Sequence, residues 1–435
     1  MIPWRSLRLL VPCWWITLLL RAADPIPINQ NESKVPAYIL PDPLRSTAGE
    51  PIRTAADWSG ARRPEVLELF RNHVYGRTPE SLPRSGSTLV SDHPQARGGR
   101  ATRQRIRVPL THGSDGPAID LLVYLPNARS GKVPVFLGLN FDGNHTVTLE
   151  SDIPLVPGWV PNRPQWGITN HAATEASRGS AAGRWPIDRL LERGYGLATV
   201  YCGDVEPDHP EGWRTGLRGA VISPGQQAPA ADAWGAIGAW AWGLSRALDA
   251  LETHPRVDGR RVAVIGHSRL GKTALWAGAQ DSRFAVVISN ESGEGGAALA
   301  RRDFGETLLR INTSFPHWFC GRFKAYNHDV ASLPVDQHEL IALIAPRPVY
   351  VASATEDLWA DPKGEFLGAL GAEPVYALFG KKGLGTSTPP PSDRSIGESI
   401  GYHNRSGKHD ITTYDWERYM DFADRHLGTR GAETR

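Results

Sequence analysis

The chain has 435 residues, of which 40% are hydrophobic and 22% are charged, so it is long enough to bury a sizeable core. Its formal net charge is only +2 and it has no block of like charges, which gives no sign of a nucleic acid or an anionic membrane surface as a partner. We therefore expect a monomeric globular protein with no nucleic-acid partner and no stable membrane partner.

The first residues have the layout of a signal peptide. Two arginines precede an apolar run over residues 9–20, and two alanines follow it. This run is shorter than a membrane span usually needs, although an uncleaved anchor is the alternative. We expect residues 1–23 to be a signal peptide, residues 24–60 an extended lead-in, and residues 61–430 one large domain of a secreted or periplasmic protein.

Two cysteines remain once the expected signal peptide is removed, namely Cys202 and Cys320. An exported protein is free to join such a pair in a disulfide. The sequence does not demand the bond, so whether the two cysteines pair is open at this point.

The first half of the chain mixes one helix with strand-like runs. Apolar residues within 62–76 recur at helical spacing and predict a helix. Residues 103–110 and 118–126 alternate in polarity around a turn-rich stretch, which predicts two antiparallel strands. Residues 132–140 are typical of a buried strand. The long irregular segment from 141 to about 192 is rich in Gly, Pro and Arg, and a loop of that size usually has a function.

The second half alternates helices with short apolar runs. Residues 231–252 predict a helix, because tryptophans, leucines and an isoleucine fall on one stripe. Short apolar runs between helices are typical of parallel strands that are covered on both faces. The pattern predicts an α/β fold with a mostly parallel central sheet and long loop insertions. The runs that predict strands are 195–203, 261–266, 284–289 and 348–354, with a further strand at 374–380.

A serine stands at the junction of a predicted strand and a predicted helix, in the stretch VIGHSRLGKTALW (264–276). A nucleophile elbow needs this context, because a sharp strand-to-helix turn lifts the hydroxyl above the sheet. Gly266 permits a close backbone approach, but Gly271 comes one residue later than the second glycine of the usual G-x-S-x-G pattern. We interpret Ser268 as a nucleophile, with an ordinary turn serine as the alternative.

A serine nucleophile needs a histidine base and an acid that orients it, and in α/β-hydrolases the acid precedes the histidine in the chain. His409 follows a long Gly/Pro/Ser loop and precedes the last predicted helix, which favours it as the base. His403 is its main competitor, whereas His426 lies within the terminal helix. Glu291 and Asp357 each follow a predicted strand directly, so both are candidate acids. For each acid the alternative is a capping or loop carboxylate.

Four stretches resemble one known family. They are GHSRLGKTAL (266–275), NESGEGGAALARR (290–302), EDLWADPKGE (356–365) and GKHDIT (407–412). Together they resemble the bacterial branch of the glucuronoyl esterases, carbohydrate esterase family 15. Members of this family are α/β-hydrolases that cleave the ester between 4-O-methyl-glucuronic acid of xylan and lignin alcohols. The resemblance implies an α/β-hydrolase fold, a three-layer sandwich, as the catalytic domain over residues 61–430.

The same resemblance assigns the catalytic residues. It implies that Ser268 is the nucleophile, His409 the base and Glu291 the acid. Bacterial members often carry a second acid after the following strand, and Asp357 matches that position. Which of the two acids is the main one is therefore left open. His267 stands where fungal members carry a half-cystine, so the disulfide of those members is absent here.

Two cations follow the serine closely, and the resemblance gives each a role. Arg269 is implied to help the oxyanion hole and Lys272 to hold the sugar, while Glu306 and Trp359 are implied to line the sugar site. A fixed cation beside the nucleophile stabilises the tetrahedral oxyanion as it forms. The alternative is that both cations only solvate the helix surface, but cations oppose the helix dipole at an N-terminus. Their position therefore favours a function.

The expected function is a serine esterase that acts on glucuronoxylan and lignin–carbohydrate esters through an acyl-enzyme on Ser268. No cofactor is expected, and no metal, because the sequence shows no cluster of His, Asp and Glu at metal-ligand spacing. One alternative is an acetyl-xylan or other carbohydrate esterase. A more distant one is a non-catalytic carbohydrate-binding relative, against which the complete set of candidate catalytic residues argues. The lignin-side alcohol and the tolerated xylan length are not readable from the sequence.

Overall fold

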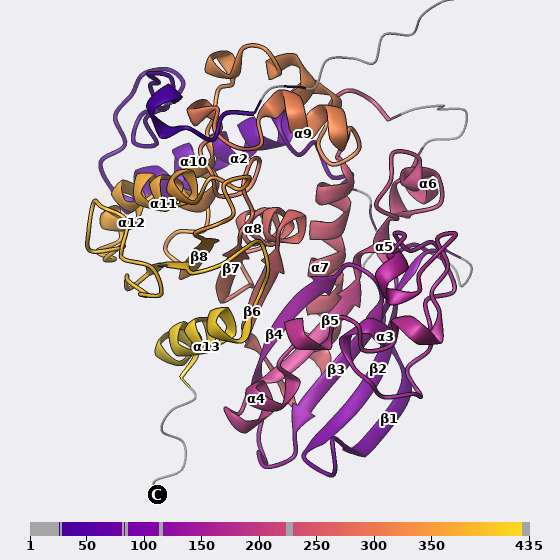
Figure 1. Cartoon of the computed structure of the whole chain (residues 1–435). Coiled ribbons are helices and arrows are strands. Elements are labelled where there is room, and N and C mark those ends of the chain that lie inside the picture. The colour runs from indigo at the N-terminus through magenta and orange to yellow at the C-terminus, as the bar shows by residue number, and fades with distance from the viewer. Residues whose placement is uncertain are drawn as a thin grey trace, which may run out of the picture.

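A nine-stranded sheet forms the centre of the computed structural model, which describes residues 26, 28–80, 82, 86–112, 116–222 and 229–428 (Figure 1). The strand order is β1-β2-β3-β5-β4-β6-β7-β8-β9. The pairs β1–β2, β2–β3 and β3–β5 are antiparallel, and all the later pairs are parallel. The strands are β1 (Thr88–Ala96), β2 (Ala101–Pro109), β3 (Ala118–Pro126), β4 (Val133–Asn140), β5 (Gly196–Tyr201), β6 (Val257–His267), β7 (Val286–Asn290), β8 (Val349–Ala354) and β9 (Ile400–Arg405).

Helices cover both faces of this sheet, so the expected α/β class with a mostly parallel sheet is confirmed. None of the helices in the described ranges is long and apolar enough to cross a membrane. The expected signal peptide of residues 1–23 lies outside the described residues. The helices are α1 (Ala55–Asp57), α2 (Arg63–His73), α3 (Asn144–Val147), α4 (Ile187–Glu192), α5 (Cys202–Val205), α6 (Leu217–Val221), α7 (Ala236–Thr253), α8 (Arg269–Gln280), α9 (Leu308–Ser314), α10 (Gln337–Ala342), α11 (Pro362–Gly371), α12 (Glu373–Leu378) and α13 (Thr413–Leu427).

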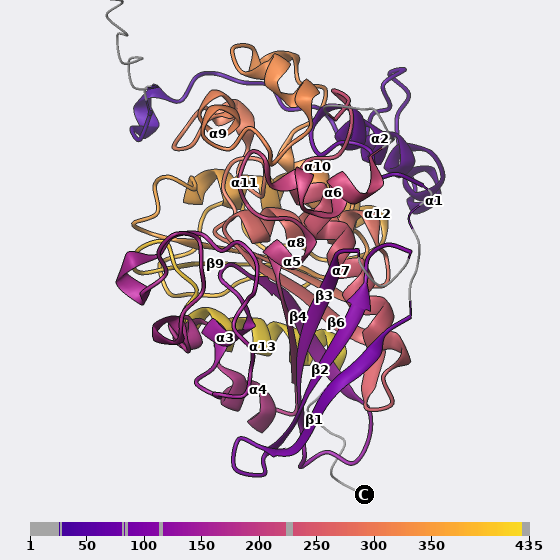
Figure 2. The same cartoon turned by 90° about the vertical axis from the view of Figure 1, so that its right-hand side faces the viewer.

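Alternate side chains of each central strand enter different cores. In β6, Val262 and Val264 pack into the cluster that contains α7 and α8, whereas Ala263 and Ile265 pack into the cluster that contains α4 and α13. This follows from the two-residue period of a strand, and it explains why a strand covered on both faces is continuously apolar. Figure 2 shows α7 on one side of the sheet and α4 and α13 on the other. The three layers hold the strand ends rigidly in place.

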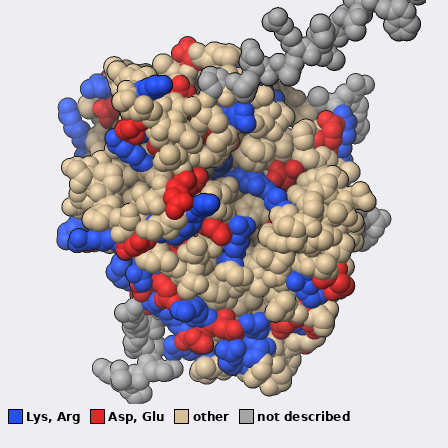
Figure 3. All heavy atoms as spheres, viewed as in Figure 1, with Lys and Arg blue, Asp and Glu red and all other residues tan. Residues whose placement is uncertain are grey.

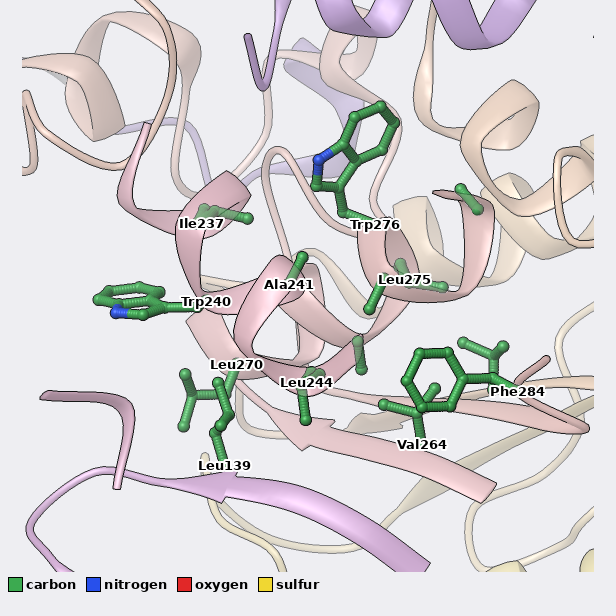
Figure 4. Packing of buried hydrophobic residues seen from close by; sticks show 14 of the residues in the cluster. Leu139, Ile237, Trp240, Ala241, Leu244, Val264, Leu270, Leu275, Trp276 and Phe284 are labelled. Carbon is green, nitrogen blue, oxygen red and sulfur yellow. The ribbon is translucent and has the colours of Figure 1, made fainter. Parts of the chain in front are cut away.

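The helix that follows the serine is locked into the first of these cores. Leu270, Leu275 and Trp276 of α8 are buried against α7 and β6, as Figure 4 shows. Each fully buried large side chain stabilises the fold by roughly 1.5–3 kcal/mol. The start of α8, and with it the serine turn, is therefore fixed by packing well away from solvent.

Most of the predicted elements are present, but one prediction is wrong. The run 374–380 lies in helix α12 and the turn that follows it instead of a strand. Pro374 suits the first turn of a helix, and a short apolar run does not by itself distinguish the two states. Two strands were missed. β1 is an exposed edge strand, and β9 has the polar sequence IGYHNR, which does not read as a buried strand.

The two cysteines do not form a disulfide. Cys202 and Cys320 are both free thiols and both are buried. Burial raises the pKa of each thiol, which keeps both in the neutral form.

Candidate active site

Ser268 occupies a strained turn between β6 and α8. Its backbone φ is 57° and ψ is −130°, a conformation that non-glycine residues rarely adopt. The turn is tight: a Cβ on Gly266 would lie 1.8 Å from the carbonyl oxygen of Leu270, so only glycine fits there. The Ser268 amide donates to the Asn290 carbonyl at 2.8 Å. Such strain at the end of a buried strand is the geometry of a nucleophile elbow.

His409 lies between the two candidate acids. Its Nδ1 is 2.6 Å from Asp357 Oδ2 and 3.1 Å from Glu291 Oε2. Glu291 follows β7 and Asp357 follows β8, so the carboxyl ends of neighbouring parallel strands deliver both acids to one imidazole, as the sequence predicted. In the described ranges, no hydrogen bond joins Ser268 Oγ to His409. The ring of His267, the residue before the serine, lies 4.5 Å from the ring of His409.

The protonation of His409 is set by these acids. Burial of Nδ1 opposes protonation, but the hydrogen bonds and charges of Asp357 and Glu291 outweigh it and raise the pKa of His409 to about 9. The side chain is still 39% exposed. Burial raises the pKa of Glu291 to about 6, an effect that the histidine and Arg405 partly offset. The pair therefore stabilises a positive imidazolium, which a general base must become.

A buried arginine ties Glu291 to the histidine loop. Arg405, at the end of β9, donates to Glu291 Oε1 at 2.7 Å and to Asp415 Oδ2 at 3.0 Å. It also donates to the carbonyls of Lys408 and Asp410, which flank the histidine, at 2.6 and 2.8 Å. The carboxylate of Glu291 thus contacts both His409 and Arg405. Asp357 makes the shorter contact with His409.

The competing histidines have other partners. His403 is fully buried, with Nε2 2.9 Å from Asp415 Oδ1 and Nδ1 3.0 Å from the hydroxyl of Tyr350. His426 contacts the Glu398 carbonyl from within α13. Neither ring faces Glu291 or Asp357, so both are structural in this fold.

Arg269 is held on the other side of the serine. Its Nε is 2.5 Å from Asp208 Oδ2, and its guanidinium lies 4.5 Å from the ring centroid of Phe141. Asp208 follows β5, whereas the two candidate acids follow β7 and β8. Because β4 and β6 separate β5 from β7 in the sheet, the cation and the base approach Ser268 from opposite directions.

The three residues implied for the sugar site lie together. Lys272 is buried at the end of the first turn of α8, donates to the Ser292 carbonyl, and has its Nζ 3.9 Å from Glu306 Oε2. The Glu306 amide donates to the Trp359 carbonyl at 2.9 Å. Burial lowers the pKa of Lys272 and raises the pKa of Glu306, and each partner's charge offsets part of the other's shift. A paired cation and anion next to a half-buried indole can bind sugar hydroxyls and a sugar ring.

One group of potential metal ligands lies inside this site. His267, Glu291 and His409 offer ligand atoms within 4.8 Å of one another. Each is already engaged, because His267 Nδ1 accepts from Asn290, Glu291 Oε2 accepts from the Asp410 amide, and His409 contacts Asp357. The three residues therefore belong to the hydrogen-bond network of the base, and the expectation of a metal-free site stays a prediction.

One face of the molecule is hollowed near its middle. Figure 3 shows basic and acidic side chains close together around a depression near the middle of the face that it displays. A concave site with several convergent charged groups is the usual form of an enzyme active site.

Sequence reasoning missed Asp208, Arg405 and Asn290. Asp208 and Asn290 each carried one available signal, since Asp208 comes shortly after a predicted strand and Asn290 directly precedes Glu291. Arg405 carried none, because its strand was not predicted.

The comparisons with known proteins agree with this site. A family model described as glucuronyl esterase of fungi matches residues 229–380. "Carbohydrate esterase MZ0003", from an unknown prokaryotic organism, is 50% identical over 413 residues, which cover 94% of this chain and 94% of that protein. A 4-O-methyl-glucuronoyl methylesterase of Schizophyllum commune is 28% identical over 354 residues, which cover 78% of this chain and 74% of the relative.

A solved structure is similarly close. The glucuronoyl esterase from Solibacter usitatus superposes with a TM-score of 0.87 at 50% sequence identity. The match covers 91% of this chain and 100% of that one. The similarity therefore extends over most of the chain.

Proposed function

Because the chain belongs to the glucuronoyl esterases, carbohydrate esterase family 15, and is a carboxylic ester hydrolase, we propose that Ser268 is the nucleophile that attacks glucuronate esters. The observation that carries this proposal is the strained elbow: φ of Ser268 is 57° at the start of α8. The ring of His267, the residue before the serine, lies 4.5 Å from the ring of His409, which contacts two carboxylates. Such strain persists only where the surrounding structure enforces it, and it clusters at reacting groups.

Acylation begins when His409 takes the proton from Ser268 as the oxygen attacks the ester carbonyl. The imidazolium that forms is stabilised by Asp357 at 2.6 Å and Glu291 at 3.1 Å. His409 then gives its proton to the leaving alcohol, and the uronyl group stays on the serine as an ester. Water repeats the sequence and frees the uronate.

The negative charge on the carbonyl oxygen needs donors that are already in place. The backbone amides of Arg269 and Leu270, the first two residues of α8, donate to no carbonyl in the described part of the chain, whereas those of Gly271 and Lys272 donate to the Ser268 carbonyl. Pre-oriented donors of this kind act on the transition state and hardly on the ground state, so they raise kcat. Arg269 is accordingly assigned to the oxyanion.

The sugar ring is assigned to the side of the site that holds Lys272, which shares the ring of Trp318 with Arg269. Lys272 and Glu306 offer a donor and an acceptor for hydroxyl groups, and Trp359 offers an apolar face. These contacts exist equally in the ground state and in the transition state. They therefore set KM and the preference for a glucuronyl group, whereas the chemistry is supplied by Ser268, His409 and Arg269.

The natural substrates in this proposal are glucuronoxylan esters and lignin–carbohydrate esters. An exported monomer would meet such substrates outside the cytoplasm, and the apolar run at the start of the chain supports export. The lead-in of residues 24–60 and the catalytic domain of residues 61–430 remain the proposed division of the chain.

The deciding experiment compares two esters under identical conditions. The purified protein is given benzyl glucuronate and, separately, an acetylated xylan, and the alcohol or acetate released is measured. The proposal expects hydrolysis of the glucuronate ester with much the larger kcat/KM. A preference for acetylated xylan would support the acetyl-xylan esterase alternative, and no turnover of any activated ester would support a non-catalytic carbohydrate-binding protein.

A further inference from the structure

The side chain of Arg269 is fixed at one end only. Its Nε lies 2.5 Å from Asp208 Oδ2, and its guanidinium is flanked by the ring centroids of Phe141 at 4.5 Å and Trp318 at 5.7 Å. Within the described part of the chain, neither Nη1 nor Nη2 donates a hydrogen bond. The two terminal amino groups are therefore the part of the cation that a substrate can engage.

Asp208 is itself held firmly. Its Oδ1 accepts from the indole of Trp318 at 2.7 Å and lies 2.9 Å from Nε2 of His317. Burial raises the pKa of Asp208, but the charge of Arg269 and the contact with His317 outweigh this and lower it to about 2. The carboxylate is thus ionised throughout the neutral range, so it is a permanent negative charge on the Nε side of Arg269.

Of the first three acids after β5, only Asp208 forms an ion pair with Arg269. Asp204 accepts from the backbone amide of Asp120 at 3.2 Å. Glu206 forms a buried ion pair with Arg218 at 2.5 Å. The placement of Asp208 is therefore specific to this arginine and does not reflect a general acidic lining.

Ester hydrolysis creates a second anion at the place where the oxyanion was. The ester and one water give a uronate carboxylate, a free alcohol and a proton, and the carboxylate remains beside Arg269, Lys272 and His409. An arginine that can present two parallel N–H groups binds a carboxylate strongly in a bidentate manner. A cation that helps the transition state can therefore also retain the product.

We infer that Asp208 is a positioning residue that aims the Nη groups of Arg269 at the oxyanion and offsets its charge, so that the product uronate is released. Asp208 blocks the Nε side of the guanidinium, which leaves the Nη side for the short-lived oxyanion. The inference rests on the proposed glucuronate chemistry, since an acetate ester would release a product that lacks the sugar contacts.

The test uses the full chain with Asp208→Asn, which keeps the shape and the Oδ1 acceptor but removes the charge. We expect kcat on methyl glucuronate to fall about 10- to 100-fold, as for the loss of alignment of one oxyanion donor. We also expect the inhibition constant of free glucuronate to fall at least about 10-fold, because an adjacent negative charge is gone. Asp208→Glu, which keeps the charge, should restore weak uronate binding.

The uronate measurement separates positioning from a merely structural role. The matched control is Glu211→Gln, because Glu211 is the next carboxylate after Asp208 and pairs with Arg214 at 2.5 Å instead of Arg269. Glu211→Gln should change uronate binding much less. The inference is overturned if Asp208→Asn binds uronate no more tightly than the natural protein does, or if Glu211→Gln tightens binding equally.

Two further controls allow the outcome to be interpreted. Uronate binding is measured by calorimetry on variants whose circular dichroism and melting temperature show them to be folded, so a loss of activity does not hide the result. If the natural protein fails to turn over methyl glucuronate, the proposed function fails, whatever the variants do. If the natural protein is active and only the uronate prediction fails, the inference alone is wrong.

Discussion

The base and the cation on either side of Ser268 are held in contrasting ways. His409 contacts two carboxylates, Asp357 at 2.6 Å and Glu291 at 3.1 Å, which come from the ends of two adjacent strands. Arg269 contacts one carboxylate, Asp208, at 2.5 Å. The base side therefore has a reserve acid and the cation side has none.

The two sides should therefore respond differently to single substitutions. Groups that share one partner compensate for each other, whereas a sole partner carries its whole effect. Single substitutions of the acids at His409 should accordingly be mild, and single substitutions along Arg269 and Asp208 should not. The following variants are ordered by the size of the change that this comparison predicts.

The largest loss of kcat is expected for substitutions of Ser268 and His409. Ser268→Ala and His409→Ala should each lower kcat by about 10⁴-fold or more, because they are parts of one nucleophilic unit. Steady-state kinetics on benzyl glucuronate measures this, with the exposed Ser406→Ala as a control for the loop. Near-natural turnover by Ser268→Ala would show that the elbow is not the site of attack.

The cation side should show the next largest loss. Arg269→Ala should lower kcat by about 100-fold on both a glucuronate ester and a small acetate ester, because both pass through the same oxyanion. The role of Arg269 is tested by the ratio of the loss in kcat on the glucuronate ester to the loss in kcat on the acetate ester. A loss confined to the glucuronate ester would move Arg269 from the oxyanion to the sugar.

Lys272 should behave differently from Arg269, although both lie at the start of α8. Lys272→Ala should raise KM for a glucuronate ester by about 10-fold and leave a small acetate ester almost unaffected, because the lysine contacts the ring in both ground and transition states. KM and kcat are measured separately on the two substrates. Equal defects on both would mean that Lys272 shapes the elbow.

The pH dependence of kcat/KM should show which acids act on His409. His409 must be neutral to accept a proton, and its pKa is raised to about 9, so kcat/KM should rise as pH increases towards that value. Asp357→Asn removes a group that raises this pKa, so the rise should move to lower pH by about 1 unit or more. Glu356→Gln, which alters an exposed neighbouring carboxylate, is the control, and an unmoved profile in Asp357→Asn would remove Asp357 from the base.

The smallest catalytic effect is expected at the other buried histidine. His403→Asn should lower the free energy of unfolding by about 1–3 kcal/mol, because Asp415 and Tyr350 lose a buried partner. Its kcat should stay close to the natural value at temperatures where it is folded. Urea denaturation and kinetics measure the two quantities, and a collapse of kcat in the folded variant would reopen the choice between His403 and His409.

The sequence predicted the α/β fold and named candidate site residues, but it did not predict every element that supports them. Ser268, His409, Glu291 and Asp357 could be chosen because each stands directly after a strand or before a helix, where the local pattern is strong. Strand β9 could not be predicted, since its buried polar residues have partners far away in the sequence, such as Tyr350 for His403 and Glu291 for Arg405. The helix at Glu373–Leu378 was mistaken for a strand because five or six apolar residues fit either period.

Arg405 and Asp208, which support the site, could not be predicted either, because their partners are far away in the sequence. Arg405 and Asp208 act through contacts that are long-range in sequence, at separations of 114 residues to Glu291 and 109 residues to His317. No local periodicity encodes such contacts. They become visible only when the strand ends are brought to one edge of the sheet.

The most direct test of the comparison is a double-mutant cycle of Glu291→Gln and Asp357→Asn, measured as kcat on benzyl glucuronate. If the two carboxylates share His409, each single variant keeps much of the activity, and the double variant loses more than the product of the single losses and approaches His409→Ala. If one single variant alone matches His409→Ala while the other has no effect, the base has one acid after all, and the contrast with Arg269 is contradicted.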